Sequence, residues 1–166
     1  MNAKPMNAGA AKPNLKVVRP SGDGEFITIT VGGQLFGIPV LSAQDVLHPQ
    51  RIFRIPLAPP QVAGSLNLRG RIVTAIDLRV CLGLPRVEDP SRSMSVVTEL
   101  SGELYSLLVD SVGEVMSLPA GDFESNPATL RPRWRELCDG VYRLDDQLLL
   151  VLNIERVLSA VSAEAA

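Results

Sequence analysis

Two segments of this chain repeat each other at a separation of 69 residues. Residues 33–46 align without gaps on residues 102–115, with five identical positions out of fourteen. At a separation of 76, residues 72–78 align on residues 148–154, so that Asp77 falls on Asn153. Both residue types cap helix N-termini well. A chance alignment of apolar strands would match hydropathy but not turns and caps, so we interpret the pattern as a duplicated unit.

The pattern within each unit is mainly that of β-strands. Residues 25–31 alternate apolar and polar side chains, and Gly32-Gly33 favours a two-residue hairpin turn. Residues 72–76 are apolar apart from Thr74, which predicts a strand buried on both faces. We also expect strands at 34–39, 51–55, 94–100, 103–109, 112–118, 141–144 and 147–152, and helical segments at 40–47, 78–82, 133–138 and 154–162.

About five strands in each half cannot bury both faces of a sheet alone. Closing each half into a small barrel, with the two barrels packed together, removes exposed edges and shares a core. We therefore predict a mainly β protein with two five-stranded barrel subdomains, short helices and a C-terminal helix. The expected boundaries are a disordered tail at 1–24, one domain at 25–162, and halves at about 25–85 and 93–153.

Charge and hydropathy narrow the classes of partner. The net charge of −2 gives no overall attraction to nucleic acid or anionic membrane. Residues 131–135 include three arginines and a tryptophan, but acids adjoin this short run, so nucleic-acid binding is not expected. No stretch approaches ~18 continuous apolar residues and no signal core begins the chain. We therefore expect a cytoplasmic protein without direct membrane insertion.

The sequence lacks most of the residue groupings on which catalysis depends. The single histidine, His48, precedes a proline and cannot form a paired-histidine metal site. Cys81 and Cys138 are far apart in apolar patterns, as expected of buried free thiols. The glycines mark hairpin turns and form no phosphate-binding motif. We predict no enzymatic activity, no cofactor and no metal.

Arg69 differs from its partner in the repeat. At the separation of 76, the turn Arg69-Gly70 falls on Asp145-Asp146. A hairpin turn tolerates either pair, so the turn itself does not require an arginine. Arg69 is therefore a candidate for binding a partner rather than for folding.

Several motifs together resemble the CheW family of chemotaxis coupling proteins. They are Phe36-Gly37-Ile38, Asp45-Val46, Asn67-Leu68-Arg69-Gly70, Asp77-Leu78-Arg79, Val109-Asp110, Gly113-Glu114-Val115 and Leu152-Asn153-Ile154-Glu155. The resemblance spans about residues 26–158 and implies two SH3-like barrels and no cofactor. It also implies partner-binding residues at Ala43, Asp45, Val46, Gly64, Asn67 and Arg69.

The resemblance implies a function as well. Similar proteins are adaptors that couple transmembrane chemoreceptors to the CheA histidine kinase, binding the kinase regulatory domain and the cytoplasmic receptor tip. Such a protein would be cytoplasmic and recruited to membrane-associated receptor arrays. The alternative is a scaffold of a chemosensory-like pathway with another output, such as surface motility. Pro39, Ala43, His48 and residues 123–127 depart from the family pattern, which leaves the receptor and kinase served open.

Overall fold

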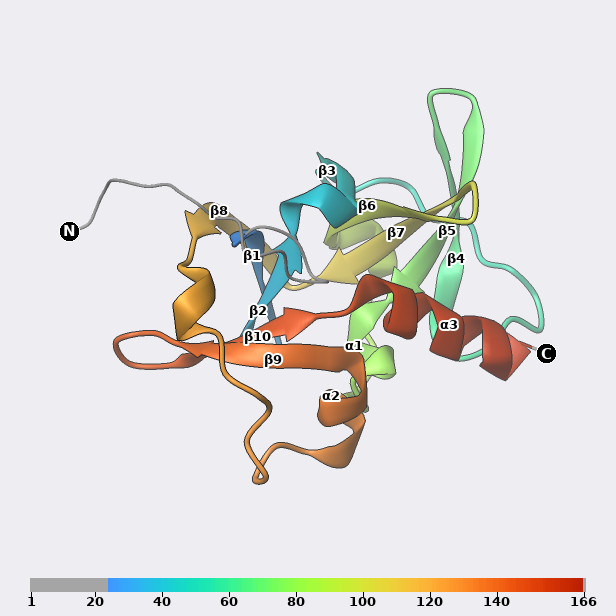
Figure 1. Cartoon of the computed structure of the whole chain (residues 1–166). Coiled ribbons are helices and arrows are strands. Elements are labelled where there is room, and N and C mark those ends of the chain that lie inside the picture. Colours follow the sequence, from blue (N-terminus) through green and yellow to red (C-terminus); the bar gives the residue numbers. More distant parts are fainter. Residues whose placement is uncertain (1–23, 166) are drawn as a thin grey trace.

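The computed structural model describes residues 24–165, and the tail expected at 1–24 lies outside them except for its last residue. Ten strands and three helices account for most of the described chain (Figure 1). The strands are β1 Glu25–Val31, β2 Gln34–Pro39, β3 Ala43–Leu47, β4 Val62–Leu68, β5 Arg71–Asp77, β6 Met94–Leu100, β7 Glu103–Val109, β8 Ser111–Ser117, β9 Cys138–Arg143 and β10 Leu148–Leu152. The helices are α1 Leu78–Cys81, α2 Pro132–Leu137 and α3 Ile154–Ala165.

The strands form two five-stranded sheets that are copies of each other. Their orders are β8-β1-β2-β10-β9 and β3-β6-β7-β5-β4, and the repeat maps one order onto the other strand by strand. The strand registers reproduce both separations in the sequence. The pair Ile29–Phe36 of the first sheet corresponds to the pair Thr98–Tyr105 of the second, 69 residues later. The parallel pair Phe36–Leu150 likewise corresponds to Tyr105–Thr74, in which Leu150 follows Thr74 by 76 residues. The predicted repeat is therefore present in the pairing of the backbone, and the fold is two SH3-like subdomains with short helices and a C-terminal helix.

Neither sheet is built from one half of the sequence, which corrects the expected division at 25–85 and 93–153. Three strands of the first sheet, β8, β9 and β10, come from the second half, and β3, β4 and β5 of the other sheet come from the first. Parallel pairing of β2 with β10, and of β5 with β7, joins the halves. The halves thus exchange strands, and neither can close its own barrel.

The apolar side chains form three clusters that follow this arrangement. One cluster lies within the first sheet around Phe26 and Tyr142, and another lies within the second sheet around Leu66 and Val97. The largest cluster joins both sheets to all three helices, and it includes Trp134. This cluster is the shared core that the sequence predicted.

Caps and side-chain contacts fix the short helices. Asp77 Oδ1 accepts from the Arg79 amide at 3.0 Å, and Asn153 Oδ1 accepts from the Arg156 amide at 2.9 Å, so both predicted caps are confirmed. The carbonyls at the end of α1 are bound from α2. Arg133 donates to the Cys81 carbonyl at 3.0 Å, and Trp134 Nε1 donates to that of Leu82 at 2.8 Å.

Three local predictions were wrong. Of residues 40–47, which were expected to form a short helix or helical turn, Val40–Ser42 form a 3-10 turn, but the rest form β3, because β3 pairs with β6. Residues 51–55 make one bridge, Phe53 to Ser65, and no full strand. Ile72 is 72% exposed, so β5 is not buried on both faces at its start. Its hairpin with β4 extends beyond the sheet, as Figure 1 shows in light green.

Candidate functional site

Asp45 and Arg69 meet at one open end of the second barrel. Arg69 Nη2 lies 3.1 Å from Asp45 Oδ2, although the two residues belong to the opposite edges of the sheet, β3 and the β4–β5 turn. They border a shallow hollow of about 190 Å³ whose remaining lining is Gln44, Leu68, Arg71, Val97 and Leu104. We call these seven residues the barrel mouth. It combines an apolar floor with a rim that carries two arginines and one carboxylate.

The backbone at Arg69 supports a role in binding. Arg69 has a φ of 52° and Gly70 a φ of 85°, as in hairpin turns of the primed types. Such turns favour asparagine or glycine at the first position, because a side chain in the left-handed region usually costs about 1–2 kcal/mol. The side chain of Arg69 is also 75% exposed, so it adds little to the core. Folding alone therefore gives no reason for an arginine here.

Two of the expected site residues shape the backbone. Asn67 Oδ1 accepts from the Gly70 amide at 3.0 Å and so braces the turn that carries Arg69. Gly64 is buried with a φ of 154°, and a Cβ there would collide with the carbonyl oxygen of Phe53. Its repeat partner Gly140 is equally crowded, by Phe123 and Glu124. Glycine at position 64 therefore lets the preceding loop approach β4.

The remaining two expected residues lie on β3. Ala43 is half-buried and pairs with Thr98, and Val46 is 37% exposed next to Asp45. Sequence reasoning missed Gln44, Arg71 and the apolar floor of the mouth. The position of Arg71, directly after the Arg69-Gly70 turn, was a signal that could have indicated it.

The other barrel does not reproduce this site. The repeat places Glu114 at the position of Asp45 and Asp145 at that of Arg69, so two acids replace the ion pair. The turn also differs, since neither Asp145 nor Asp146 has a positive φ. The Leu144 amide donates to the Gln147 carbonyl at 2.8 Å across the predicted turn at Asp145-Asp146, and the two ends of the molecule differ in charge.

The described residues hold no candidate metal site, and their two cysteines are buried. Within residues 24–165, no cluster of three histidine, cysteine or acidic side chains could hold a metal ion. Burial raises the pKa of the Cys81 thiol to about 12, and that of Cys138 likewise to about 12, which suppresses the nucleophilic thiolate. Both are free cysteines. The barrel mouth can recognise a partner side chain, but it contains no nucleophile or histidine.

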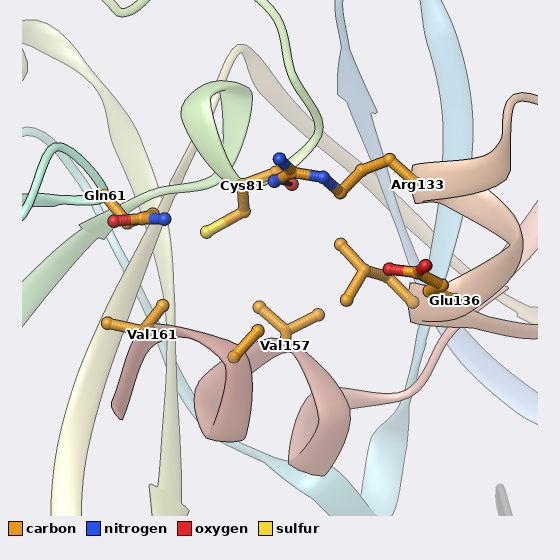
Figure 2. Close-up of a pocket in the computed structure, with 8 residues that line it drawn as sticks. Gln61, Cys81, Arg133, Glu136, Val157 and Val161 are labelled. Atoms are coloured by element: carbon orange, nitrogen blue, oxygen red, sulfur yellow. Dashed lines mark hydrogen bonds between the residues drawn. The ribbon is translucent and has the colours of Figure 1, made fainter. Parts of the chain in front are cut away.

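A second hollow lies on another face, between the three helices (Figure 2). It has a volume of about 200 Å³, and Figure 2 shows the Cys81 thiol directed into it above Val157 and Val161. Arg133 and Glu136 stand at one end and Gln61 at the other (Figure 2). None of its lining residues belongs to the barrel mouth, so the two hollows are separate.

Comparison with known proteins places the chain in a family. The model of the CheW-like domain matches residues 25–162, which is nearly all of the described chain. The chain belongs to the CheW-like domain family. The match spans both sheets and α3 up to residue 162, including the barrel mouth.

Individual relatives agree with this assignment. The chain is 30% identical to the chemotaxis protein CheW of Klebsiella aerogenes, over 82% of each chain. It is 25% identical to a probable CheW of Rhizobium etli, over 87% of this chain and 94% of the relative. Protein PilI of Pseudomonas aeruginosa is 26% identical over 75% of this chain and 70% of its own length.

A solved structure resembles the fold. The scaffolding protein TtCheW from Thermoanaerobacter tengcongensis superposes with a TM-score of 0.70, at 24% identity, over 78% of this chain and 88% of that one. At 24% identity this likeness concerns the fold. Among the described residues, no helix is long and apolar enough to cross a membrane.

Proposed function

We propose that this chain is a non-enzymatic adaptor that couples transmembrane chemoreceptors to a CheA-type histidine kinase. It would bind the kinase regulatory domain and the cytoplasmic receptor tip, and so be recruited to receptor arrays at the membrane. Membership of the CheW-like family supports this proposal. The single observation that carries it is the exposed Asp45–Arg69 pair at the barrel mouth.

The chemistry of the mouth favours an acidic partner surface. A guanidinium has five N–H donors in a planar fork, and the structure gives Arg69 one hydrogen bond, to Asp45. A partner carboxylate can therefore bind Arg69 alongside Asp45, while Arg71 contributes a second positive charge. An apolar side chain of the partner would enter the floor at Val97 and Leu104. The other four expected residues, Ala43, Val46, Gly64 and Asn67, would support or flank this contact.

The test is a reconstituted array with exchanged charges. Receptor signalling fragments on vesicles, the kinase and the adaptor are mixed, and the adaptor in the pellet is measured. Asp45→Arg replaces the ion pair by two cations and Arg69→Asp replaces it by two anions, so each should weaken co-sedimentation, whereas the double variant restores the internal ion pair. If the partner contacts Arg69 directly, the double variant remains defective. Full sedimentation of both single variants would contradict this role of the mouth.

A second candidate function has one observation in its favour. PilI is not named as a chemotaxis protein, and it matches at 26% identity, close to the values for the CheW relatives. The chain would then be a scaffold in a chemosensory-like pathway with another output, such as surface motility. Deleting the gene and scoring swimming and surface spreading separates the two candidates.

A further inference from the structure

The loop between β3 and β4 presents a leucine in an unusual conformation. Leu57 is fully exposed, at 104%, and has a φ of 64°. It follows Pro56 in a turn in which the Ala58 amide donates to the Ile55 carbonyl at 3.4 Å. Proline followed by a residue with positive φ is typical of a type II turn, which favours glycine or asparagine at the second place. Leucine is therefore unfavourable at this position, because the φ is positive and the apolar side chain is exposed to solvent.

Hydrogen bonds anchor the loop on both sides of this turn. Phe53 exchanges two backbone hydrogen bonds with Ser65 of β4, at 2.7 and 2.8 Å. The Ile52 amide also donates to the Ser91 hydroxyl at 3.0 Å. On the far side, the Val62 amide donates to the Pro59 carbonyl at 3.0 Å. An exposed side chain on an anchored turn loses little freedom on binding, which favours association.

The hollow between α1, α2 and α3 matches such a side chain in size, and part of its lining is apolar. Its volume is about 200 Å³, and apolar lining comes from Leu137, Val157, Ala160 and Val161 (Figure 2). An apolar cavity of about 150 Å³ already holds a six-carbon ring, so one leucine side chain fits.

The leucine and the hollow lie on neighbouring parts of the surface. Gln61, which lines the hollow, follows Leu57 by four residues, and so lies within roughly 14 Å of it along the chain. Gln61, at the end of this loop, and Val161 of α3 both line the hollow, so the loop reaches α3 there. A twofold axis between such neighbours would place each leucine over the hollow of the other copy. Arg54 of the loop is exposed and Glu136 lines the hollow beside Arg133, so a contact between Arg54 of one copy and Glu136 of the other would add charge complementarity.

We propose that two copies of this chain associate through a twofold interface in which Leu57 of each copy inserts into the hollow between the three helices of the other. This interface goes beyond the adaptor role and does not depend on it. It uses no residue of the barrel mouth, so the Asp45–Arg69 pair is not part of the contact.

Sedimentation equilibrium of the purified full chain, from about 5 μM to about 500 μM, measures the dimer. Leu57→Asn relaxes the turn while it removes the apolar side chain, so this variant folds and its dimer is weakened about tenfold or more. Ala160→Phe blocks the hollow from an exposed position and should weaken the dimer similarly. Leu41→Asn is the matched control, because Leu41 is also exposed, at 77%, but lies outside the hollow and the loop.

Mixing the two weakened variants gives the decisive result. The Ala160→Phe copy keeps its leucine and the Leu57→Asn copy keeps its hollow, so the mixture contains one intact contact and associates more strongly than either variant alone. A parent that stays monomeric over the whole range overturns the proposal. A dimer that Leu57→Asn leaves unchanged, or a mixture no stronger than its components, overturns it as well.

Discussion

Replacing Arg69 by asparagine separates folding from binding. Asn-Gly is a preferred pair for this turn, and Arg69 has a φ of 52°. The substitution removes an exposed ion pair worth about 0–1 kcal/mol. It also relieves part of a left-handed penalty of about 1–2 kcal/mol. The free energy of unfolding should therefore change by less than about 1 kcal/mol, which shifts the melting temperature by less than about 4 °C for a domain of this size.

Binding should respond much more strongly than stability. Truncating an arginine at the centre of an interface costs on the order of 2 kcal/mol, or about thirtyfold in affinity. The matched control is Ser101→Asn, because Ser101 and Gly102 form the same kind of turn in the β6–β7 hairpin, with φ values of 54° and 83°. Calorimetric melting and receptor-dependent kinase control are measured for both variants.

The two variants should differ in kinase control but not in stability. We expect Arg69→Asn to melt close to the parent and to lose most kinase control, and Ser101→Asn to keep both. If Arg69→Asn unfolds, the arginine is structural and the argument from the turn is wrong. If it keeps full kinase control, the barrel mouth is not the coupling site.

Three further predictions concern other residues. Asp110 is partly desolvated, which raises its pKa, but hydrogen bonds from Arg79 and the Gly32 amide, with the charge of Arg79, outweigh this and hold the pKa below its ordinary value. The stability that Asp110 contributes is therefore present above its pKa in the unfolded chain and is lost as pH falls through its pKa in the folded protein. Acid titration of Asp110→Asn should accordingly show a shallower loss of stability below about pH 4 than titration of the parent. Gly64→Ala should destabilise the fold by about 2 kcal/mol or more in urea unfolding because of the collision with Phe53, whereas Gly121→Ala, which has open space, should change it by less than about 0.5 kcal/mol. Iodoacetamide at pH 8 should leave Cys81 and Cys138 unmodified until denaturant is added, as mass spectrometry would show, and rapid labelling of the native protein would contradict their burial.

The sequence predicted most of the fold because local chemistry and the repeat agree. Alternating strands, glycine turns and the caps at Asp77 and Asn153 are local features that pairing in the folded state left in place. The exchange of strands between the halves was missed, because it depends on parallel pairing of β2 with β10, and neither strand shows its partner in its own residues. The helix expected at 40–47 failed for a related reason, since tertiary pairing with β6 overrode a weak helical spacing.

The candidate site was predicted in part. Arg69 stood out because its repeat partner is an acid, and the resemblance brought in Asp45, but only the structure shows the two in contact. Gly64 and Asn67 could not be separated from binding residues by sequence, because a glycine needed for close backbone approach and one needed at an interface look alike. Val97 and Leu104 of the floor lie on β6 and β7, which are distant from Arg69 in sequence and meet it only when the barrel forms.

The most direct test of the adaptor role is kinase activity in a reconstituted array. Receptor fragments, a CheA-type kinase and this chain are combined on vesicles, and phosphorylation of the kinase is followed with and without attractant. The proposal predicts high activity that attractant suppresses only when the chain is present, and loss of that control with Arg69→Asn. Equal activity with and without the chain would contradict it.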